Sequence, residues 1–377
     1  MANRSVLITG GAGFVGSTLA FQLLQRGDSV TVLDRLHPQI HTEESLSSER
    51  MVLLRERTRF IEGDVRDPTA VSMAIEGVDT VVHLAAETGT GQSMYEIHRY
   101  VETNIGATAL LLDILTNSRH SVDRFVVASS RSIYGEGRYR TRDGNFTYPE
   151  SRNIGQLQNG QFEVCGSDGV PLELVPTHES SMLHPSSVYG ITKQNQEQMV
   201  LTVCPTIDIA PVALRYQNVY GPGQSLSNPY TGILSIFSTL LRQGREINVF
   251  EDGLESRDFV YIDDVVSATE LAVHGRGDGM ALNIGSGVAT SVLTVVEELA
   301  RSLHVEPKFR VTGNFRIGDI RHNVADISRA REHLGYLPRW DFQRGIESFA
   351  SWVLGEPVRM GSYDESLAEM RDRNLLK

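Results

Sequence analysis

The amino-acid sequence predicts an α/β fold in which a doubly wound, Rossmann-type parallel sheet is joined to a smaller α/β lobe. Three observations support this expectation. Short apolar segments rich in β-branched residues alternate with segments of helical periodicity through the first part of the chain, a pattern typical of parallel sheets covered by helices. The first apolar segment runs directly into a glycine-rich turn. The length of 377 residues suits about two domains.

The composition excludes several classes of function. The 47 acidic residues outnumber the 35 basic ones and give a net charge of −12, which argues against a nucleic-acid partner and against binding to an anionic membrane. No apolar run reaches the roughly 18 residues that a transmembrane helix needs. The two cysteines, Cys165 and Cys204, are too few for a disulfide framework or a cysteine-based zinc site. We therefore expect no metal and a reduced, cytoplasmic setting.

The first strand, turn and helix have the pattern of a dinucleotide-binding unit. Residues 5–9 form a β-rich run, residues 17–25 have helical spacing, and residues 29–33 form a second strand. A tight turn beside a pyrophosphate favours residues without Cβ, and the free N–H groups at the start of a helix suit phosphate oxygens. The predicted cofactor-binding residues of this unit are Gly10, Gly13, Phe14, Val15 and Gly16.

An acid closes the second strand and indicates which dinucleotide binds. Asp34 should accept hydrogen bonds from the adenosine ribose hydroxyls. Because its carboxylate would repel a 2′-phosphate, NAD is favoured over NADP as the cofactor. The neighbouring Arg35 could hold such a phosphate, but a solvated surface charge is the interpretation that we prefer for it.

Three more strands and a helix extend the alternation. The strands are predicted at residues 58–65, 80–86 and 124–130, and the helix at residues 104–115. Ligands of such sheets bind beyond the carboxyl ends of the strands. The third strand ends with Asp64, whose carboxylate suits the edge of an adenine ring.

The end of the fourth strand is also predicted to face the cofactor. The small side chains of Ala85 and Ala86 would let a ligand lie against the strand end. His83 stands inside the apolar run before them, so we expect it to be a packed strand residue rather than a ligand or base.

A serine, a tyrosine and a lysine form the predicted catalytic group. Ser130 ends the fifth strand, where the nicotinamide should lie. Tyr189 and Lys193 are four residues apart and therefore share one face of a helix. A free phenol has a pKa of about 10, and a nearby ammonium favours its ionised form. We predict that Tyr189 takes a proton from a substrate hydroxyl, that Lys193 assists it and binds the nicotinamide ribose, and that Ser130 holds the same substrate oxygen.

Together these motifs resemble the extended short-chain dehydrogenases/reductases, namely the NAD-dependent nucleotide-sugar epimerases and dehydratases. The resemblance covers residues 4–355 and rests on the glycine turn, Asp34, residues 63–65 and 83–86, Asn104, residues 129–130, the tyrosine–lysine pair, and residues 215–223 and 257–264. It implies further cofactor contacts from Asp64, Val65, Leu84, Ala85, Ala86 and Asn104. It also implies a homodimer built through a four-helix bundle that includes the tyrosine helix.

The resemblance further implies that the C-terminal lobe binds a nucleoside-diphosphate sugar. Asn218 matches an asparagine that contacts the diphosphate, and Arg257 and Arg316 match arginines that bind phosphate. Guanidinium groups suit phosphate oxygens, which agrees with this assignment. Val249 and its two neighbours are expected to run along the nucleotide base, and Arg321 is a weaker phosphate candidate.

The residues after Ser130 narrow the range of reactions that the chain could catalyse. Dehydratases of this family place Asp-Glu there and uronate decarboxylases keep a glutamate, whereas this chain has Arg131 and Ser132. Redox chemistry at one carbon remains, either 4-epimerisation with retained NAD or ketone reduction or dehydrogenation with an exchanging cofactor. The preference of Asp34 for NAD favours epimerisation. A sensor or scaffold that binds NAD without turnover is the alternative from another class, and the intact catalytic group argues against it.

A finer resemblance connects residues 87–97, 214–218 and 228–234 with bacterial dTDP-L-rhamnose 4-epimerases, which interconvert dTDP-L-rhamnose and dTDP-6-deoxy-L-talose. It implies the same reaction here, with UDP-hexose or UDP-hexuronate 4-epimerisation as the alternative. The loop at residues 88–93 follows the fourth strand and should border the sugar. Its candidates for contacting sugar hydroxyls are Thr90, Gln92 and Ser93, although a loop that packs on itself is an equally open interpretation.

The expected domain organisation follows from these motifs. Residues 1–219 form the NAD-binding domain, with an insertion near residues 138–183. Residues 220–355 form most of the nucleotide-sugar lobe, and residues 254–271 return to the first domain. The charged tail, residues 356–377, is expected to be loose. For the insertion we prefer a surface excursion over a lid or an oligomer contact.

Overall fold

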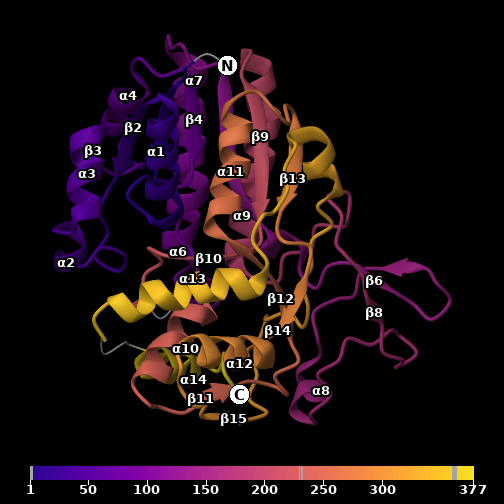
Figure 1. The fold of residues 1–377 in the computed structure, drawn as a ribbon. Helices are drawn as coiled ribbons and strands as arrows, with labels where there is room; N and C mark the ends of the chain where they lie inside the picture. The colour runs from indigo at the N-terminus through magenta and orange to yellow at the C-terminus, as the bar shows by residue number, and fades with distance from the viewer. Residues whose placement is uncertain (1–2, 229, 231, 359–362) are drawn as a thin grey trace.

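The centre of the molecule is a seven-stranded sheet in which every neighbouring pair of strands is parallel. The computed structural model describes residues 3–228, 230, 232–358 and 363–377 (Figure 1). From edge to edge the strands are β13 (Met280–Ile284), β9 (Ala210–Tyr216), β5 (Arg124–Ser130), β4 (Thr80–His83), β1 (Ser5–Thr9), β2 (Ser29–Asp34) and β3 (Arg59–Glu62). The order reverses between β1 and β4, beside which doubly wound sheets bind ligands. The predicted fold class is confirmed.

Helices cover both faces of this sheet. Because side chains alternate along a strand, Val6 and Ile8 of β1 enter one core and Leu7 enters the other. The first core is completed by α1 (Phe14–Arg26), α3 (Glu49–Arg57) and α11 (Ile262–Val273), and the second by α4 (Pro68–Ile75), α7 (Ala107–Asn117) and α9 (Val188–Val203). Short helical turns lie at α2 (Glu43–Leu46), α5 (Thr90–Ser93), α6 (Ile97–Tyr100), Val101–Gly106, Arg131–Tyr134, Cys204–Ile207 and Ala330–Leu334.

A second lobe packs below the carboxyl ends of the central strands (Figure 1). Its strands are β10 (Asn218–Tyr220), β12 (Ser256–Tyr261) and β14 (Ala289–Ser291) in one sheet, and β11 (Ile247–Val249) and β15 (Phe309–Val311) in another. Its helices are α10 (Ile233–Arg242), α12 (Val292–Ser302), α13 (Phe342–Gly355) and α14 (Tyr363–Asp372). Between its strands the chain returns to the first lobe, but not over the predicted residues 254–271: β12 belongs to the second lobe, and the return consists of α11, which packs on α1, and β13, which pairs with β9.

The insertion is an ordered excursion from the surface of the molecule. The antiparallel strands β6 (Tyr139–Arg140), β7 (Phe146–Thr147) and β8 (Glu173–Leu174) form a small sheet that projects from the molecule, and α8 (Ile154–Gln158) lies beside it (Figure 1). Its base is fixed by buried charges, since Arg152 pairs with Glu136 at 3.2 Å and with Glu251 of the second lobe at 2.8 Å.

The predicted loose tail is wrong for the described part of residues 356–377. In α14 the side chains of Tyr363, Leu367 and Met370 are buried in the main core, because they recur on one helix face. The last residues pair with the stretch after β15, and the Ile317 amide donates to the Leu375 carbonyl at 2.9 Å. Residues 359–362 of this tail, and residues 229 and 231 of the stretch 228–234, lie outside the described residues.

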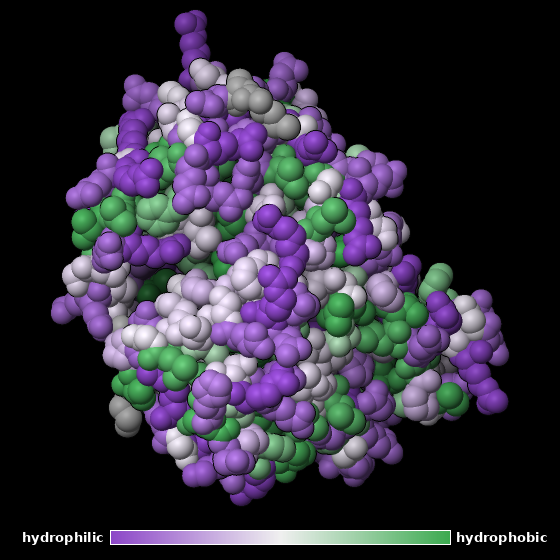
Figure 2. All heavy atoms as spheres, in the orientation of Figure 1, coloured by the Kyte–Doolittle hydropathy of each residue, from purple (hydrophilic) through white to green (hydrophobic). Residues whose placement is uncertain are grey.

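The surface shows no large apolar face in the view of Figure 2, where hydrophobic side chains are scattered among polar ones. None of the helices in the described chain combines the length and the apolar character needed to cross a bilayer.

Candidate active site

A cleft of about 1010 Å³ lies between the carboxyl ends of the central strands and the second lobe. Its lining includes Gly10, Asp34, Ala85, Ser130 and Tyr189 from the first lobe. Asn218, Phe250, Arg257 and Arg316 contribute from the second. This volume is at the upper end of small-molecule sites, as two large ligands held together would require.

The glycine turn leaves room for a dinucleotide. A Cβ on Gly16 would overlap the Gly10 carbonyl oxygen, and a Cβ on Gly10 would lie 2.9 Å from the Ala85 backbone. Gly10 also has φ +69°, which other residues rarely adopt. Helix α1 begins at Phe14 with no side-chain cap and no acid in its first turn, so its first N–H groups remain available to phosphate oxygens.

Asp34 is held rigidly at the end of β2. Its carboxylate accepts hydrogen bonds from the Ala12 amide at 3.0 Å and the Leu36 amide at 2.9 Å. The side chain of His41 approaches it to 3.8 Å, and burial lowers the pKa of this imidazole. Asp34 thus brings a carboxylate to the cleft beside the glycine turn, where the sequence placed the ribose-binding acid.

Arg35 is not the solvated surface charge that we expected. Its guanidinium spans the cleft wall and pairs with Asp64 at 3.4 Å and with Glu87. Asp64 also receives three hydrogen bonds from Arg66, two from the side chain and one from the backbone amide, which outweigh its burial and lower its pKa to about 2. Asp64 and Val65 line the cleft, as predicted, but Asp64 reaches it with two arginine partners already bound.

The residues after β4 divide into two groups. Leu84, Ala85 and Ala86 line the cleft, as predicted. Asn104 is fully buried and lies behind the cleft: its side chain bonds the backbone of Glu87 at 2.7 and 3.1 Å and the Thr192 hydroxyl at 2.9 Å. Through these bonds Asn104 joins this loop to the tyrosine helix.

His83 is a packed strand residue, as expected. Burial and the nearby Lys193 lower the pKa of its imidazole to about 3. Its ring nitrogens hydrogen bond to Thr9 at 2.7 Å and Thr108 at 3.0 Å.

The structure brings Ser130 and Tyr189 together. Ser130 is the last residue of β5, and α9, capped by the Ser187 hydroxyl bonding the Gly190 amide at 3.1 Å, places Tyr189 in its first turn. A hydrogen bond with Ser130 and the charge of Arg131 oppose the rise in the pKa of Tyr189 that burial causes. The Ser132 hydroxyl donates to Ser130 Oγ at 2.9 Å, so the Ser130 proton is the one directed toward Tyr189.

Lys193 does not line the cleft. It is 3% exposed, and its Nζ donates to Gln196 Oε1 at 2.8 Å. Burial lowers the pKa of the ammonium to about 7, against the attraction of Glu197. Tyr189 and Lys193 share one helix face, as predicted, but the ammonium of Lys193 is bonded to the buried side-chain amide of Gln196.

Of the loop residues predicted to face the sugar, only Thr90 lines the cleft. Gln92 is buried and bonded to Gln39 at 3.2 Å and Glu96 at 3.3 Å, and the Ser93 hydroxyl donates to the Thr90 carbonyl at 2.6 Å. Both side chains are thus bonded within the protein, Ser93 to its own loop and Gln92 also to Gln39.

The second lobe supplies an amide and two arginines. Asn218 Oδ1 is buried in the cleft wall without a hydrogen-bond partner within the described chain, which leaves it available to a ligand. The Arg316 guanidinium lies over the Phe250 ring, 4.9 Å from its centroid, and faces the cleft. Arg257 lines the cleft too, but it already pairs with Asp319 at 2.9 Å. Both arginine charges hold the pKa of Asp319 below its usual value, although burial would raise it.

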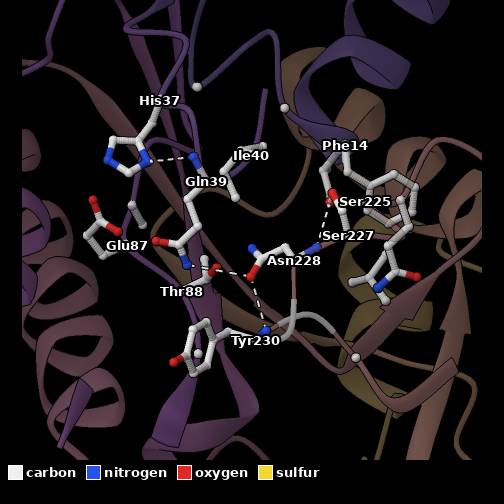
Figure 3. Close-up of a pocket in the computed structure, with 18 of the residues that line it drawn as sticks. Phe14, His37, Gln39, Ile40, Glu87, Thr88, Ser225, Ser227, Asn228 and Tyr230 are labelled. Carbon is white, nitrogen blue, oxygen red and sulfur yellow. Dashed lines mark hydrogen bonds between the residues drawn. The ribbon is translucent and has the colours of Figure 1, made fainter. Parts of the chain in front are cut away.

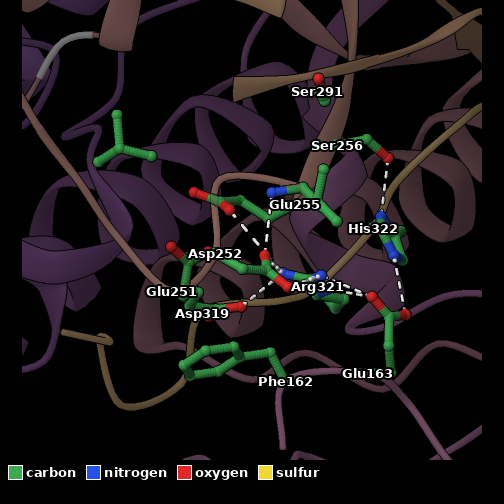
Figure 4. Close-up of polar contacts among 12 residues, drawn as sticks. Phe162, Glu163, Glu251, Asp252, Glu255, Ser256, Ser291, Asp319, Arg321 and His322 are labelled. Carbon is green, nitrogen blue, oxygen red and sulfur yellow. Dashed lines mark hydrogen bonds and ion pairs between the residues drawn. The ribbon is translucent and has the colours of Figure 1, made fainter. Parts of the chain in front are cut away.

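Two predicted residues of this lobe do not reach the cleft. Val249 is fully buried in β11, while its neighbours Asn248 and Phe250 line the cleft. Arg321 is enclosed by acids in the ion network of Figure 4, including Glu163 of the insertion and Asp252. Its role is to join the insertion to the second lobe.

Gln39, Tyr363 and Met370 of the cleft had no signal in the sequence, whereas Asn228 and Tyr230 belong to the stretch 228–234 of the finer resemblance. Gln39, after β2, donates to Asn228 of the second lobe at 3.5 Å, and Asn228 Oδ1 accepts the Tyr230 amide at 3.0 Å (Figure 3). Tyr363 and Met370 of α14 close the cleft from the far end of the chain. Such contacts join segments that are distant in sequence, so no local sequence pattern predicts them.

No group of three or more metal-ligating side chains occurs in the described parts of the chain. The open helix start and the glycine turn instead fit a phosphate-containing dinucleotide, and the Arg316 guanidinium fits a second phosphorylated ligand.

Comparisons with known proteins agree with this geometry. A dTDP-L-rhamnose 4-epimerase from Burkholderia thailandensis is 39% identical over 357 residues, which is 94% of this chain and 96% of that protein. The structure of a UDP-glucose 4-epimerase from Thermotoga maritima with UDP-glucose matches with a TM-score of 0.75 and 28% identity, over 93% of this chain and 99% of that one. A UDP-glucuronic acid 4-epimerase from Bacillus cereus, solved with UDP-glucuronic acid and NAD, matches with a TM-score of 0.75 and 25% identity over the same shares.

The family model that describes NAD dependent epimerases and dehydratases matches residues 6–153 and 158–285. This match covers more than half of the chain, and it includes the glycine turn, Ser130, Tyr189 and Asn218. The chain therefore belongs to the NAD dependent epimerase/dehydratase family.

Proposed function

We propose that the protein is an NAD-dependent nucleotide-sugar 4-epimerase that interconverts dTDP-L-rhamnose and dTDP-6-deoxy-L-talose. The observation that carries the reaction type is the pair of Ser130 and Tyr189 at the end of β5, followed by Arg131 and Ser132 instead of acids. The relative from Burkholderia thailandensis supports the substrate.

The carboxylate of Asp34, the glycine turn and the start of α1 would hold the cofactor. A bound NAD would supply the hydride acceptor for C4 of the sugar and, once reduced, the hydride donor for the opposite face. Tyr189 Oη would take the proton of the C4 hydroxyl during oxidation and give it back when the ketone is reduced. The Ser130 hydroxyl, whose oxygen already accepts a hydrogen bond from Ser132, would donate to the same substrate oxygen. No acid beside Ser130 is available to remove water from the sugar.

The second lobe would hold the diphosphate while the sugar turns. Arg316 and the Asn218 side chain line the cleft, where their N–H groups can donate to phosphate oxygens, and Phe250 offers a flat surface to a nucleotide base. Epimerisation requires this anchor, because only a sugar that remains tethered can present both faces of its ketone to one hydride donor.

The test is proton NMR of dTDP-L-rhamnose with purified enzyme and catalytic NAD⁺, without a reductant. We expect dTDP-6-deoxy-L-talose signals that approach a fixed ratio. An unchanged spectrum from folded, NAD-loaded enzyme would exclude this substrate, and the same assay with UDP-hexoses and UDP-hexuronates would then decide between the remaining 4-epimerases. A reaction that proceeds only with stoichiometric NADH would indicate a reductase.

We further propose a cytoplasmic homodimer. Two free cysteines fit a reduced compartment. The side chains of Ile97, Val101 and Ile191 are 51%, 41% and 45% exposed near α9 and would gain from burial against a second copy. Light scattering after size-exclusion chromatography gives the mass that checks this assembly.

A further inference from the structure

Arg35 is a cation next to the predicted ribose-binding acid. It directly follows Asp34, and both residues line the cleft. An arginine in this place could bind the 2′-phosphate that distinguishes NADP from NAD, because a guanidinium forms charge-assisted hydrogen bonds with phosphate oxygens. Asp34 acts in the opposite sense, since its carboxylate repels the same phosphate. The end of β2 therefore carries one group that favours NADP and one that opposes it.

Two carboxylates hold the guanidinium of Arg35. Its NH2 group donates to Glu87 Oε1, in the loop after β4. Its NH1 group lies 3.4 Å from Asp64 Oδ2, an oxygen that Arg66 approaches more closely, at 2.7 Å. Asp64 is therefore engaged mainly by Arg66, and Glu87 is the principal partner of Arg35. The Glu87 side chain is 9% exposed, so water screens this ion pair less than it would a surface pair.

Glu87 is held in position from two sides. Its other carboxylate oxygen accepts a hydrogen bond from Arg99, which Glu96 holds in turn at 2.6 Å. Its backbone amide donates to the side chain of Asn104 at 2.7 Å, and its carbonyl accepts from the same side chain at 3.1 Å. Glu87 itself lines the cleft (Figure 3). Because Arg99 occupies one oxygen and the backbone is fixed, the second oxygen is directed at Arg35.

We propose that Glu87 is a second determinant of cofactor choice, which disfavours NADP by occupying Arg35. The inference rests on the proposed function for the class of cofactor, but not for the reaction. Asp34 repels a 2′-phosphate, and Glu87 withholds a cation that could offset this repulsion. A phosphate would have to displace the carboxylate of Glu87 from Arg35 and leave that largely buried charge with one partner fewer. NAD has neutral hydroxyls at this ribose and gains little from a released Arg35.

Competition between the two dinucleotides tests the proposal without turnover. NAD-loaded protein is equilibrated with increasing NADP⁺, and the nucleotides that remain bound are quantified by chromatography. Asp34→Ser serves as the background, because removal of the repulsion brings NADP binding into a measurable range. Relative to this variant, Asp34→Ser/Glu87→Gln should shift the ratio of affinities toward NADP by about tenfold, as a charge-assisted hydrogen bond to phosphate provides. Its retained nucleotide shows that the variant is folded.

Two further variants decide whether the shift passes through Arg35. Arg35→Ala, added to the double variant, should reverse the shift. Glu96→Gln in the Asp34→Ser background is the matched control: it removes an acid that pairs with Arg99 but keeps the Arg35–Glu87 pair, and should change the ratio by less than about twofold.

An unchanged ratio in the double variant would overturn the proposal. So would a shift that persists with Arg35→Ala or that Glu96→Gln reproduces, because a general loss of negative charge would then be its cause. Failure to epimerise any nucleotide sugar would contradict the proposed function alone, since the competition measures binding and still decides the role of Glu87.

Discussion

At the scale of single residues, the proposed reaction depends on one hydroxyl on the first turn of α9. Tyr189 stands opposite Ser130 because β5 ends at Ser130 and the Ser187 cap fixes where α9 begins. The two side chains are 59 positions apart in sequence, yet the end of one strand and the start of one helix are enough to bring them together.

Tyr189→Phe is expected to retain the fold and NAD binding and to lose about 10²- to 10⁴-fold in turnover, because only the proton-transferring Oη is removed. The NMR epimerisation rate and calorimetric titration with NAD⁺ measure the two properties separately. Tyr139→Phe is the matched control, since its hydroxyl is buried in the insertion and has no hydrogen-bond partner among the described residues. Wild-type turnover by Tyr189→Phe would remove this residue from the mechanism.

Residues whose position follows from a strand end were predictable, and residues whose orientation depends on distant partners were not. Asp34, Ala85 and Ser130 reach the cleft because parallel strands end at one edge of the sheet. Gln92 and Val249 lie next to cleft-lining residues in the sequence. Gln92, however, turns toward Gln39, and the alternation of side chains along β11 points Val249 into the core. Neither side-chain orientation can be predicted from the residue type alone.

At the scale of elements, α14 is the segment that the sequence described least well. Its charged residues suggested a loose tail, but one face carries Tyr363, Leu367 and Met370 into the core. On the other side Glu369 Oε2 accepts hydrogen bonds from Tyr95 at 3.0 Å and Tyr230 at 2.8 Å. The helix thus bonds to a loop of the first lobe and a loop of the second at once.

Leu367→Ala is expected to lower the free energy of unfolding by about 2–4 kcal/mol, because Leu367 is 3% exposed and its truncation leaves a cavity in the core. Urea unfolding measures this loss. Leu354→Ala on α13 is the matched control: Leu354 is 49% exposed, and its truncation should change stability by less than about 0.5 kcal/mol. Equal effects of the two changes would mean that α14 does not pack in solution as it does here.

At the scale of the whole molecule, a buried ion network joins the insertion, the second lobe and the cleft (Figure 4). Arg321 is fully buried at its centre and forms a two-point contact with Asp252, at 2.7 and 2.9 Å. Glu255 lies at its edge, with Oε2 at 3.8 Å from Arg321 and no hydrogen bond to that oxygen from any described residue. The network therefore holds close together two acids, Asp252 and Glu255, whose pKa values are shifted in opposite directions.

The pH dependence of stability should separate these two acids. Burial raises the pKa of Glu255 to about 7 despite the attraction of Arg257. The folded protein then binds its proton more tightly than the unfolded chain does, so stability falls as the pH rises from about 4.5 to about 7. The hydrogen bonds from Arg321 lower the pKa of Asp252 although burial would raise it. That carboxylate therefore stabilises the fold above pH 4, and its contribution is lost as the pH falls further.

Glu255→Gln removes the group that is destabilising when ionised, while Asp252→Asn removes a favourable ion pair. Urea unfolding at pH 8 should show Glu255→Gln more stable than the wild type by on the order of 1–3 kcal/mol, with the difference vanishing near pH 4. Asp252→Asn should be less stable than the wild type at pH 8. Loss of stability in both variants at pH 8 would show that Arg321 needs both carboxylates ionised, and that its attraction outweighs the cost of burying Glu255.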